Sequence, residues 1–286
     1  MKSQLFLFYL ALWLANDLMA QQTPPICYAP THSNVSYQSV LDLPVSSPTE
    51  IISYGESEFQ FGEYWKPRFS NPDSKQPLVV LIHGGCWLNS FDVKHTHALS
   101  TALSESGYAV LALEYRRTGD AGGGWPGSYY DIRLALASLD TIMPDQVDRN
   151  RIAVVGHSAG GHLALLHGSE HQSNGSIKAV IGLAPIVDLV SYSKGEGSCQ
   201  QASVKFMGGD SSQHTAAYKA ATVKDKTLHP NSFILQGDMD HIVSPEQAKS
   251  AKTDNLLIIK GAGHFDMVHP YTQSFSELLK LLAKTL

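Results

Sequence analysis

Continuous apolar runs alternate along this chain with segments of helical spacing. The four strongest runs are PLVVLIHGG, YAVLALEYR, RIAVVGH and IKAVIGLAP, at residues 77–85, 108–116, 151–157 and 177–185. Such runs are typical of strands that are buried on both faces of a parallel sheet. Helical spacing follows three of these segments, at residues 90–107, 128–143 and 160–168. Because parallel strands need crossover connections, this order predicts an α/β chain with helices on both faces of a mostly parallel sheet.

Three other segments depart from this alternation. Residues 58–67, EFQFGEYWKP, alternate with period two, which predicts an antiparallel strand. Residues 21–50 are rich in Pro, Ser and Thr and are expected to form an arm or loop. Residues 188–228 show no strong periodicity, which leaves open a small lid or insertion. We expect residues 21–286 to form a single domain.

The first twenty residues have the pattern of a secretory signal peptide. Lys2 precedes an apolar run from Leu5 to Ala15, and the small residue Ala20 precedes two glutamines. The apolar run is too short to be expected to span a bilayer. We therefore predict cleavage near Ala20 and a secreted or periplasmic protein without a stable membrane anchor. The alternative is a buried first helix.

Charge and residue usage exclude several classes of function. The formal net charge is −5 and there is no basic run, so nucleic acid is not expected as a partner. The chain contains 13 histidines, but neither H-E-x-x-H nor C-x-x-C occurs. We therefore expect no catalytic metal and no other cofactor. The oligomeric state is left open.

The segment VVGHSAGGH contains the pattern G-x-S-x-G, from Gly156 to Gly160, with Ser158 at its centre. A predicted strand precedes it and a helix of small residues follows it. The glycines permit a sharp turn that exposes the serine hydroxyl above the sheet. A serine hydroxyl becomes a good nucleophile only when a neighbouring base takes its proton. The pattern therefore predicts a histidine and an acid further along the chain.

Candidates for both partners follow the last predicted strands. HGG, GHS, QGD and GAGH all come at strand ends, so they are expected to meet at one edge of the sheet. We predict His264, in GAGH, as the base. His157 adjoins the serine, so its side chain is expected to point elsewhere. From position alone, Asp238 and Asp240 both remain candidates for the acid.

These motifs together resemble the α/β-hydrolase superfamily. Within it the chain is most similar to hormone-sensitive-lipase-like carboxylesterases and kynurenine-formamidase-like enzymes. The motifs that carry the resemblance are HGGCW (83–87), EYRR (114–117), GGGWPG (122–127), GHSAGGHLAL (156–165), APIVDL (185–190), QGDMDHIVSP (236–245) and GAGH (261–264). The resemblance implies an α/β-hydrolase fold with a central sheet of about eight strands. It favours Asp240 as the triad acid, because Gly237, Asp240 and Val243 match the G-x-x-D-x-x-V-P pattern.

The resemblance also implies an oxyanion hole after the strand that ends in HGG. Its donors would be the backbone amides of Gly85, Cys86 and Ala159. Cys86 stands where the longer family form, HGGG, has its third glycine. Trp87 is expected either to form a wall of the acyl pocket or to be a packing aromatic. Near this site we expect Glu114 and Arg116 to form a structural ion pair.

The chain has three cysteines, which in an oxidising compartment suggests one disulfide and one free thiol. Cys86 belongs to the oxyanion loop, where a disulfide is expected to distort the donors. We therefore predict a bridge between Cys27 and Cys199, with Cys86 free.

The function predicted from these residues is a secreted serine hydrolase that cleaves small-molecule carboxylic esters through an acyl-enzyme. Its triad would be Ser158, Asp240 and His264. Because the same triad also cleaves amides, an arylformamidase-like enzyme or an exopeptidase is the alternative. A non-catalytic binding module on the same fold is a third possibility.

Overall fold

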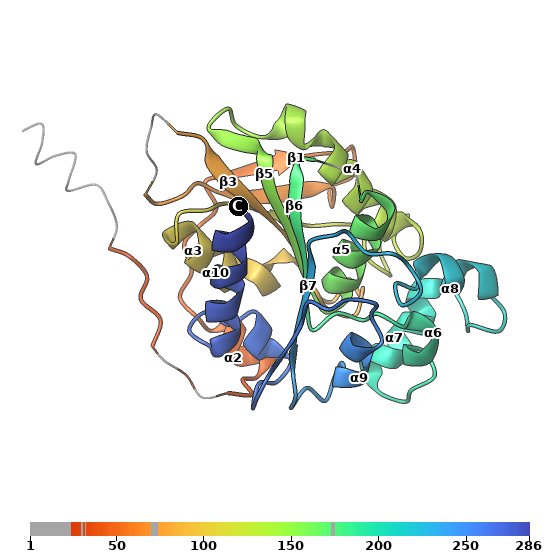
Figure 1. The fold of residues 1–286 in the computed structure, drawn as a ribbon. Coiled ribbons are helices and arrows are strands. Elements are labelled where there is room, and N and C mark those ends of the chain that lie inside the picture. Colours follow the sequence, from red (N-terminus) through yellow and green to blue (C-terminus); the bar gives the residue numbers. More distant parts are fainter. Residues whose placement is uncertain (1–23, 30, 32, 70–73, 173–174) are drawn as a thin grey trace, which may run out of the picture.

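The computed structural model describes residues 24–286, except residues 30, 32, 70–73 and 173–174 (Figure 1). The predicted signal peptide, residues 1–20, lies outside the described residues. Across the part of the chain that is described, no helix has both the length and the apolar character needed to cross a membrane.

One eight-stranded sheet forms the centre of the molecule. Its order is β1-β2-β4-β3-β5-β6-β7-β8. The strands are β1 (Glu50–Ser53), β2 (Phe61–Trp65), β3 (Gln76–Ile82), β4 (Ala109–Leu113), β5 (Val147–His157), β6 (Ile177–Leu183), β7 (Ser232–Gly237) and β8 (Leu256–Ile259). The strand β2 pairs antiparallel with β1 and β4, and all other pairs are parallel. The predicted mostly parallel sheet of about eight strands is therefore confirmed.

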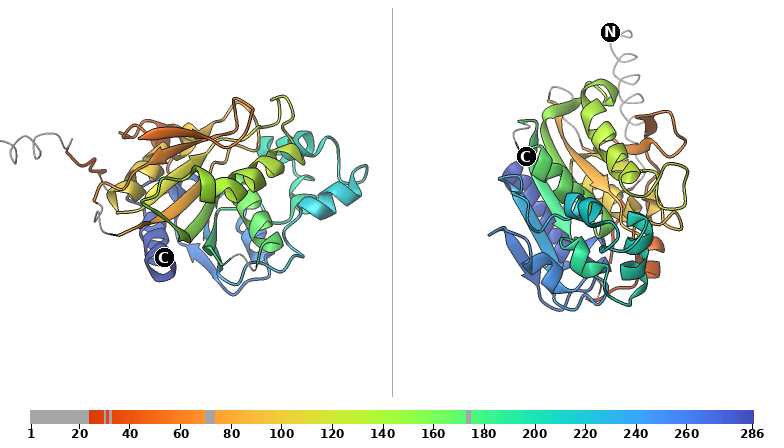
Figure 2. Two further views of the ribbon diagram at one scale, coloured as in Figure 1. Left: turned by 90° about the horizontal axis from the view of Figure 1, so that it is seen from above. Right: turned by 90° about the vertical axis from the view of Figure 1, so that its right-hand side faces the viewer.

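Helices cover both faces of the sheet, as the alternation predicts (Figure 1). One face carries α2 (Tyr37–Leu41), α3 (His97–Glu105) and α10 (Gln273–Thr285). The other carries α4 (Gly127–Ile142), α5 (Ala159–Glu170), α6 (Leu189–Tyr192), α7 (Ser198–Met207), α8 (Thr215–Ala221) and α9 (Pro245–Lys249). Two short 3-10 helices are η1 (Val93–Thr96) and η2 (Phe265–Met267). The rotated views in Figure 2 show the twisted sheet between these layers.

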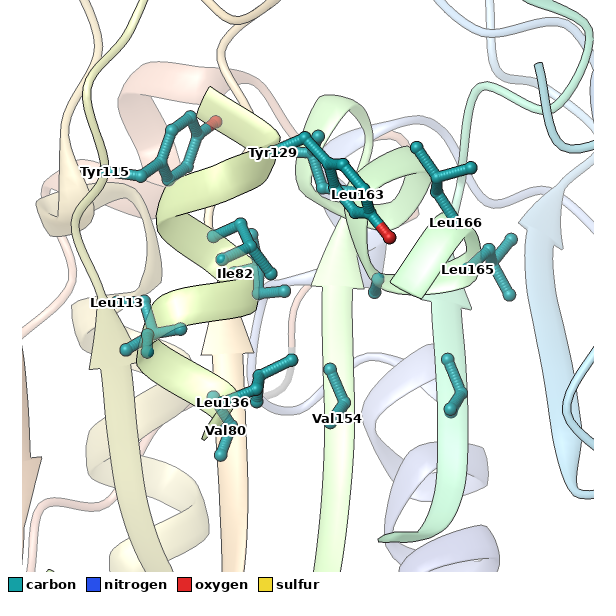
Figure 3. Close-up of a cluster of buried hydrophobic side chains, with 14 of the residues drawn as sticks. Val80, Ile82, Leu113, Tyr115, Tyr129, Leu136, Val154, Leu163, Leu165 and Leu166 are labelled. Carbon is teal, nitrogen blue, oxygen red and sulfur yellow. The ribbon is translucent and has the colours of Figure 1, made fainter. Parts of the chain in front are cut away.

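The strand β3 shows why its sequence is a continuous apolar run from Leu78 to Ile82. Successive side chains of a strand point to opposite faces of the sheet. Leu78, Val80 and Ile82 accordingly join the cluster beneath α4 and α5 (Figure 3), while Val79 and Leu81 join the cluster beneath α3 and α10. Complete burial of a side chain of this size stabilises the fold by about 1.5–3 kcal/mol. A strand with helices on both sides therefore gains from an apolar residue at every position.

The N-terminal arm lies along the face that carries α3 and α10. The hydroxyl of Tyr28, which is buried, donates to the carbonyl oxygen of Ala98 in α3 at 3.3 Å. Further along, the backbone amide of Ser46 donates to Oγ1 of Thr101 at 3.0 Å, again in α3. The segment expected to be an arm is thus held by hydrogen bonds to α3. It also contains the short helix α2, which precedes β1.

The predicted disulfide is wrong. Cys86 is bonded to Cys199, with their Cα atoms 5.1 Å apart, and Cys27 is a free, exposed thiol. The reason is the sheet. Tyr28, next to Cys27, packs in the cluster on the α3 and α10 face, whereas the helix α7, which contains Cys199, packs in the cluster on the other face. Cys27 and Cys199 therefore lie on opposite sides of the sheet, and α7 brings Cys199 to the loop that contains Cys86.

Candidate active site

Ser158 stands in a strained turn between β5 and α5. Its backbone has φ +55° and ψ −117°, a left-handed φ that is uncommon for residues other than glycine. A Cβ at Gly156 would collide with the carbonyl oxygen of Gly160, and a Cβ at Gly160 would collide with that of Ile82. The amide of Ser158 donates to the carbonyl of Leu183 in β6 at 2.8 Å. The glycines therefore permit the close approach of strand, turn and helix that this serine needs.

His264 is hydrogen-bonded to one of the two candidate acids. Its Nδ1 lies 2.7 Å from Oδ2 of Asp240, and the two side chains are 5% and 0% exposed. An ionised carboxylate only accepts hydrogen bonds, so Nδ1 carries the hydrogen and Nε2 is left to take a proton. His264 immediately precedes η2, while Asp240 follows β7, and the two loops thus meet at the carboxyl edge of the sheet.

Three further hydrogen bonds orient the Asp240 carboxylate. Its Oδ1 accepts the backbone amides of Ile242 at 2.9 Å and Val243 at 2.8 Å. Its Oδ2 also accepts Nε2 of Gln236 at 3.0 Å. Gln236, the first residue of the QGD motif, was not among the predicted site residues. These donors hold the buried carboxylate in one orientation.

Asp238 has a different environment. It is exposed, and its Oδ1 accepts the backbone amide of Gly261 at 2.6 Å. This bond joins the loop after β7 to the turn after β8. Of the two aspartates, Asp240 is therefore the one in contact with His264, while Asp238 shapes the neighbouring turn.

The loop between β3 and η1, called the oxyanion loop because the oxyanion hole is expected there, lies directly beside Ser158. A Cβ added to Gly84 would come within 3.1 Å of Cβ of Ser158. The next three residues, Gly85, Cys86 and Trp87, all have left-handed backbone, with φ of +101°, +54° and +58°. Ala159 begins α5, so its amide has no acceptor within the helix. Gly84 of this loop is thus packed against Ser158, and the amide of Ala159, which has no acceptor within α5, directly follows the serine.

Trp87 has the packing role that the sequence left as its alternative. The side chain is 0% exposed. Its ring stacks on Phe206 of α7, with centroids 4.7 Å apart, and meets the edge of His162 at 5.4 Å. The helix α7 is therefore attached to the oxyanion loop twice, through this stacking and through the adjacent Cys86–Cys199 disulfide.

The predicted ion pair between Glu114 and Arg116 is wrong. Arg116 pairs with Asp131 of α4 at 2.6 Å. Glu114, which follows β4, instead bonds Nε2 of His83 at 2.9 Å and the amide of Val93 at 3.0 Å. Although burial alone would raise the pKa of the Glu114 carboxyl, His83 and Arg117 lower it. One buried carboxylate thus holds both ends of the oxyanion loop.

The His264 loop is held by a contact with the N-terminal arm, which the sequence did not predict. The buried carboxylate of Asp266 accepts the backbone amides of Asn34 at 2.9 Å, Val35 at 3.0 Å and Gly263 at 3.0 Å. The first two donors belong to the N-terminal arm. More than 200 residues separate the arm from this loop, and no local pattern indicates the contact.

The chemistry of this site is that of acid–base and nucleophilic groups. Among the described residues, no group of three or more His, Cys, Asp or Glu side chains is arranged to hold a metal ion. The arrangement brings together a serine in a strained turn, a histidine oriented by a carboxylate, and backbone amides beside the serine. This combination is typical of serine hydrolases.

Comparison with known proteins identifies the family of this chain. A family model described as BD-FAE matches residues 68–254. The chain belongs to the BD-FAE family. The matched segment of this BD-FAE protein contains Ser158 and Asp240, whereas His264 lies beyond its end at residue 254.

Relatives and solved structures support the same fold. Esterase LipC of Mycobacterium tuberculosis is 25% identical over 277 residues, 87% of this chain and 64% of LipC. Dipeptidyl aminopeptidase A of Saccharomyces cerevisiae is 24% identical over 240 residues, 79% of this chain and 25% of that protein. The chain therefore spans less than two thirds of either relative. The structure of a truncated carbohydrate esterase from gut microbiota superposes with a TM-score of 0.71 at 17% identity, covering 84% of this chain and 96% of that one. The α/β-hydrolase fold is thereby confirmed.

Proposed function

We propose that this protein is a serine hydrolase that cleaves small-molecule carboxylic esters through an acyl-enzyme. The observation that carries the proposal is the 2.7 Å bond between Nδ1 of His264 and Oδ2 of Asp240. It lies at the sheet edge where Ser158 occupies its strained turn. With Nδ1 engaged, Nε2 of His264 is available to activate the serine.

The reaction proceeds in two halves. Oγ of Ser158 attacks the ester carbonyl carbon while Nε2 of His264 takes the hydroxyl proton. The imidazolium then gives that proton to the leaving alcohol, and Asp240 stabilises the positive charge. In the second half, His264 takes a proton from water as the water oxygen attacks the acyl carbon. The bond from that carbon to Oγ of Ser158 then breaks, the imidazolium returns the proton to Oγ, and the acid is released. In both halves the amides of Gly85, Cys86 and Ala159 donate to the oxyanion.

The names of the relatives favour an ester as the substrate. LipC is an esterase, and the structural neighbour is a carbohydrate esterase. We therefore expect activity on a panel of short-chain p-nitrophenyl, acetyl-sugar and feruloyl esters. The rank order of kcat/KM on this panel would identify the acyl and alcohol groups that the site accepts.

The first prediction tests the nucleophile. Ser158→Ala is expected to lower kcat on p-nitrophenyl acetate by about 10⁶-fold, as loss of an activated serine does, while the protein stays folded. Ser169→Ala, at the other end of α5, is the matched control and should keep wild-type turnover. If the wild type shows no turnover on the ester panel, the esterase proposal is wrong, and if it shows none on amide substrates either, a non-catalytic binding module replaces it. If pure Ser158→Ala keeps more than a small fraction of the wild-type turnover, the assignment of the nucleophile is wrong.

An amide hydrolase is the second candidate, and the match to dipeptidyl aminopeptidase A favours it. The same three residues would act, with an amine as the leaving group. Turnover of dipeptide p-nitroanilides and N-formyl arylamines, compared with the ester panel on the same preparation, separates the two. A higher kcat/KM on an amide than on every ester would replace the esterase proposal.

Export is also part of the proposal. The Cys86–Cys199 disulfide supports it, because intrachain disulfides persist in oxidising compartments. We propose that residues 21–286 form the mature single-domain enzyme. N-terminal sequencing of the protein from its native host should begin near Gln21. A mature protein that still begins at Met1 would contradict this proposal.

A further inference from the structure

Two buried histidines, His157 and His95, are hydrogen-bonded in series to the backbone of His264. Nε2 of His157 is 3.0 Å from the backbone carbonyl oxygen of His264. Nδ1 of His157 is 2.7 Å from Nε2 of His95, which belongs to η1. His157 and His95 are each 2% exposed. The rings of His157 and His264 are 4.6 Å apart between centroids.

The partners determine which nitrogen of each ring carries hydrogen. A carbonyl oxygen only accepts, so Nε2 of His157 must be the donor to His264. In a neutral His157 ring, Nδ1 then accepts, and Nε2 of His95 must be the donor. The remaining nitrogen, Nδ1 of His95, is a bare acceptor, and it has no hydrogen-bond partner among the described residues.

Both rings are held neutral by their surroundings. Burial, followed by the charges of His83 and His264, lowers the pKa of His95 to about 3. Burial and the charges of His264 and His95 likewise hold the pKa of His157 well below its usual value. The two hydrogen bonds therefore keep one direction over the whole pH range in which an esterase of this kind would work.

Three segments of the site meet at His157. Ser158 follows it directly in the chain. A Cβ added to Gly84 of the oxyanion loop would lie 3.1 Å from Nδ1 of His157, so this loop is packed against the ring. His264 is tied to the same ring through its backbone carbonyl.

We propose that His157 is a positioning residue, which with His95 holds the backbone of His264 at a set distance from Ser158 and the oxyanion loop. The inference rests on the proposed function of Ser158 and His264. His157 itself exchanges no proton with substrate. A displacement of about 1 Å between reacting groups can lower the rate about 100-fold, so loss of this support is expected to affect kcat more than KM.

The experiment replaces His95, whose Nε2 donates the hydrogen bond to His157. His95→Leu removes the hydrogen bond to His157, whereas the amide nitrogen of His95→Gln can restore a donor near the same place. On the best ester of the panel, His95→Leu is expected to lower kcat about 10- to 100-fold with KM within about twofold. His95→Gln should recover most of the lost kcat. His167→Leu removes a buried histidine near the far end of α5 and is the matched control, expected to keep wild-type kcat.

Each result decides between support and failure. If His95→Leu keeps wild-type kcat, or if His95→Gln loses as much as His95→Leu, the positioning role is wrong. The same holds if only KM changes. If His95→Leu does not fold, His95→Asn, whose shorter amide falls short of His157, takes its place in the same comparison. A wild-type enzyme without Ser158-dependent turnover would contradict the proposed function, whereas Ser158-dependent turnover with unaffected His95 variants would contradict this inference alone.

Discussion

The two halves of the candidate site are held in place by different means. In the half that contains the serine and the oxyanion loop, Ser158, Cys86 and Trp87 have left-handed backbone, with φ of +55°, +54° and +58°. Residues in such regions cost on the order of 1–3 kcal/mol each. In the half that contains the acid and the histidine, His264 has ordinary helical backbone, with φ −61°. Asp240 receives four hydrogen bonds there, from His264, Gln236, Ile242 and Val243.

This difference shows that a strained backbone and a side chain that must be oriented are stabilised by different kinds of contact. A strained loop relaxes unless its surroundings hold it, and here a disulfide to α7 and the buried Glu114 carboxylate do so. An unstrained loop needs only to have its side chains aimed, which hydrogen bonds to fixed backbone donors achieve. Loss of a restraint in the first half is therefore expected to lower the free energy of unfolding, and loss of an aiming contact in the second half to lower turnover.

The largest effect is expected in the second half, at the bond between Asp240 and His264. Asp240→Asn can no longer stabilise the imidazolium, and it favours the wrong tautomer of His264. We expect kcat to fall on the order of 10⁴-fold at neutral pH, with little change in melting temperature. Steady-state kinetics and thermal melts of the same preparation measure both quantities.

Asp238→Asn is the matched control for this change, two residues away. It weakens the bond to the amide of Gly261 and is expected to cost about 1 kcal/mol of stability with most turnover kept. If instead Asp238→Asn abolishes turnover while Asp240→Asn leaves it near wild type, the assignment of the acid is wrong.

The next largest effect tests the first half, through the disulfide. The bridge closes a loop with a sequence separation of 113 residues, and its removal is expected to lower the free energy of unfolding by about 2–5 kcal/mol. Urea unfolding of the double variant Cys86→Ser and Cys199→Ser, compared with wild type, measures the loss. The kcat of the double variant, corrected for the fraction of molecules that is folded, should fall less than that of Asp240→Asn.

Cys27→Ser is the control for the disulfide, because Cys27 is free and exposed. It should match wild type in both stability and turnover. Peptide mapping under non-reducing conditions should recover a peptide pair joined through Cys86 and Cys199. Recovery of Cys27 in the bridged pair would contradict the structure and remove the covalent restraint from the comparison.

The smallest effect is expected at Asp266, which ties the His264 loop to the N-terminal arm. The carboxylate accepts amides with both oxygens, whereas Asp266→Asn offers one acceptor oxygen and leaves a buried amide without a partner. We expect a loss of about 1–3 kcal/mol in the free energy of unfolding and faster hydrogen exchange at Asn34 and Val35. Asp42→Asn, exposed in the same arm, is the control. A loss larger than that of the disulfide variant would reverse the ranking of the two halves.

Much of the fold was predictable because its signals are local. A strand between two helix layers is apolar wherever both faces are covered, as from Leu78 to Ile82 of β3, and this shows in a few consecutive residues. The serine turn was equally clear, because Gly156 and Gly160 each face backbone that leaves no room for a Cβ. His264 followed from its place after the last strand. The choice of Asp240 over Asp238 needed more than position, since residues two apart in an extended segment point the same way.

The wrong predictions share a cause, which is that they concern contacts between distant segments. Glu114 and Arg116 are close in sequence and opposite in charge. However, Glu114 bonds His83 and Val93, while Arg116 bonds Asp131 of α4. The charge pattern indicates that a buried carboxylate needs hydrogen-bond or ion-pair partners. It does not indicate which distant residues the fold places next to that carboxylate.

The strands, the strained serine turn and the residue types that the chemistry needs can be predicted from short stretches of sequence, because each depends on sterics and burial within a few residues. The contacts that support them depend on how distant segments pack. The pairing of Cys86 with Cys199, the bonds from Asp266 to the arm, and the contact of His157 with His95 and His264 all depend on which face of the sheet each connection crosses. That choice is made by the packing of whole layers, and no short stretch of residues encodes it.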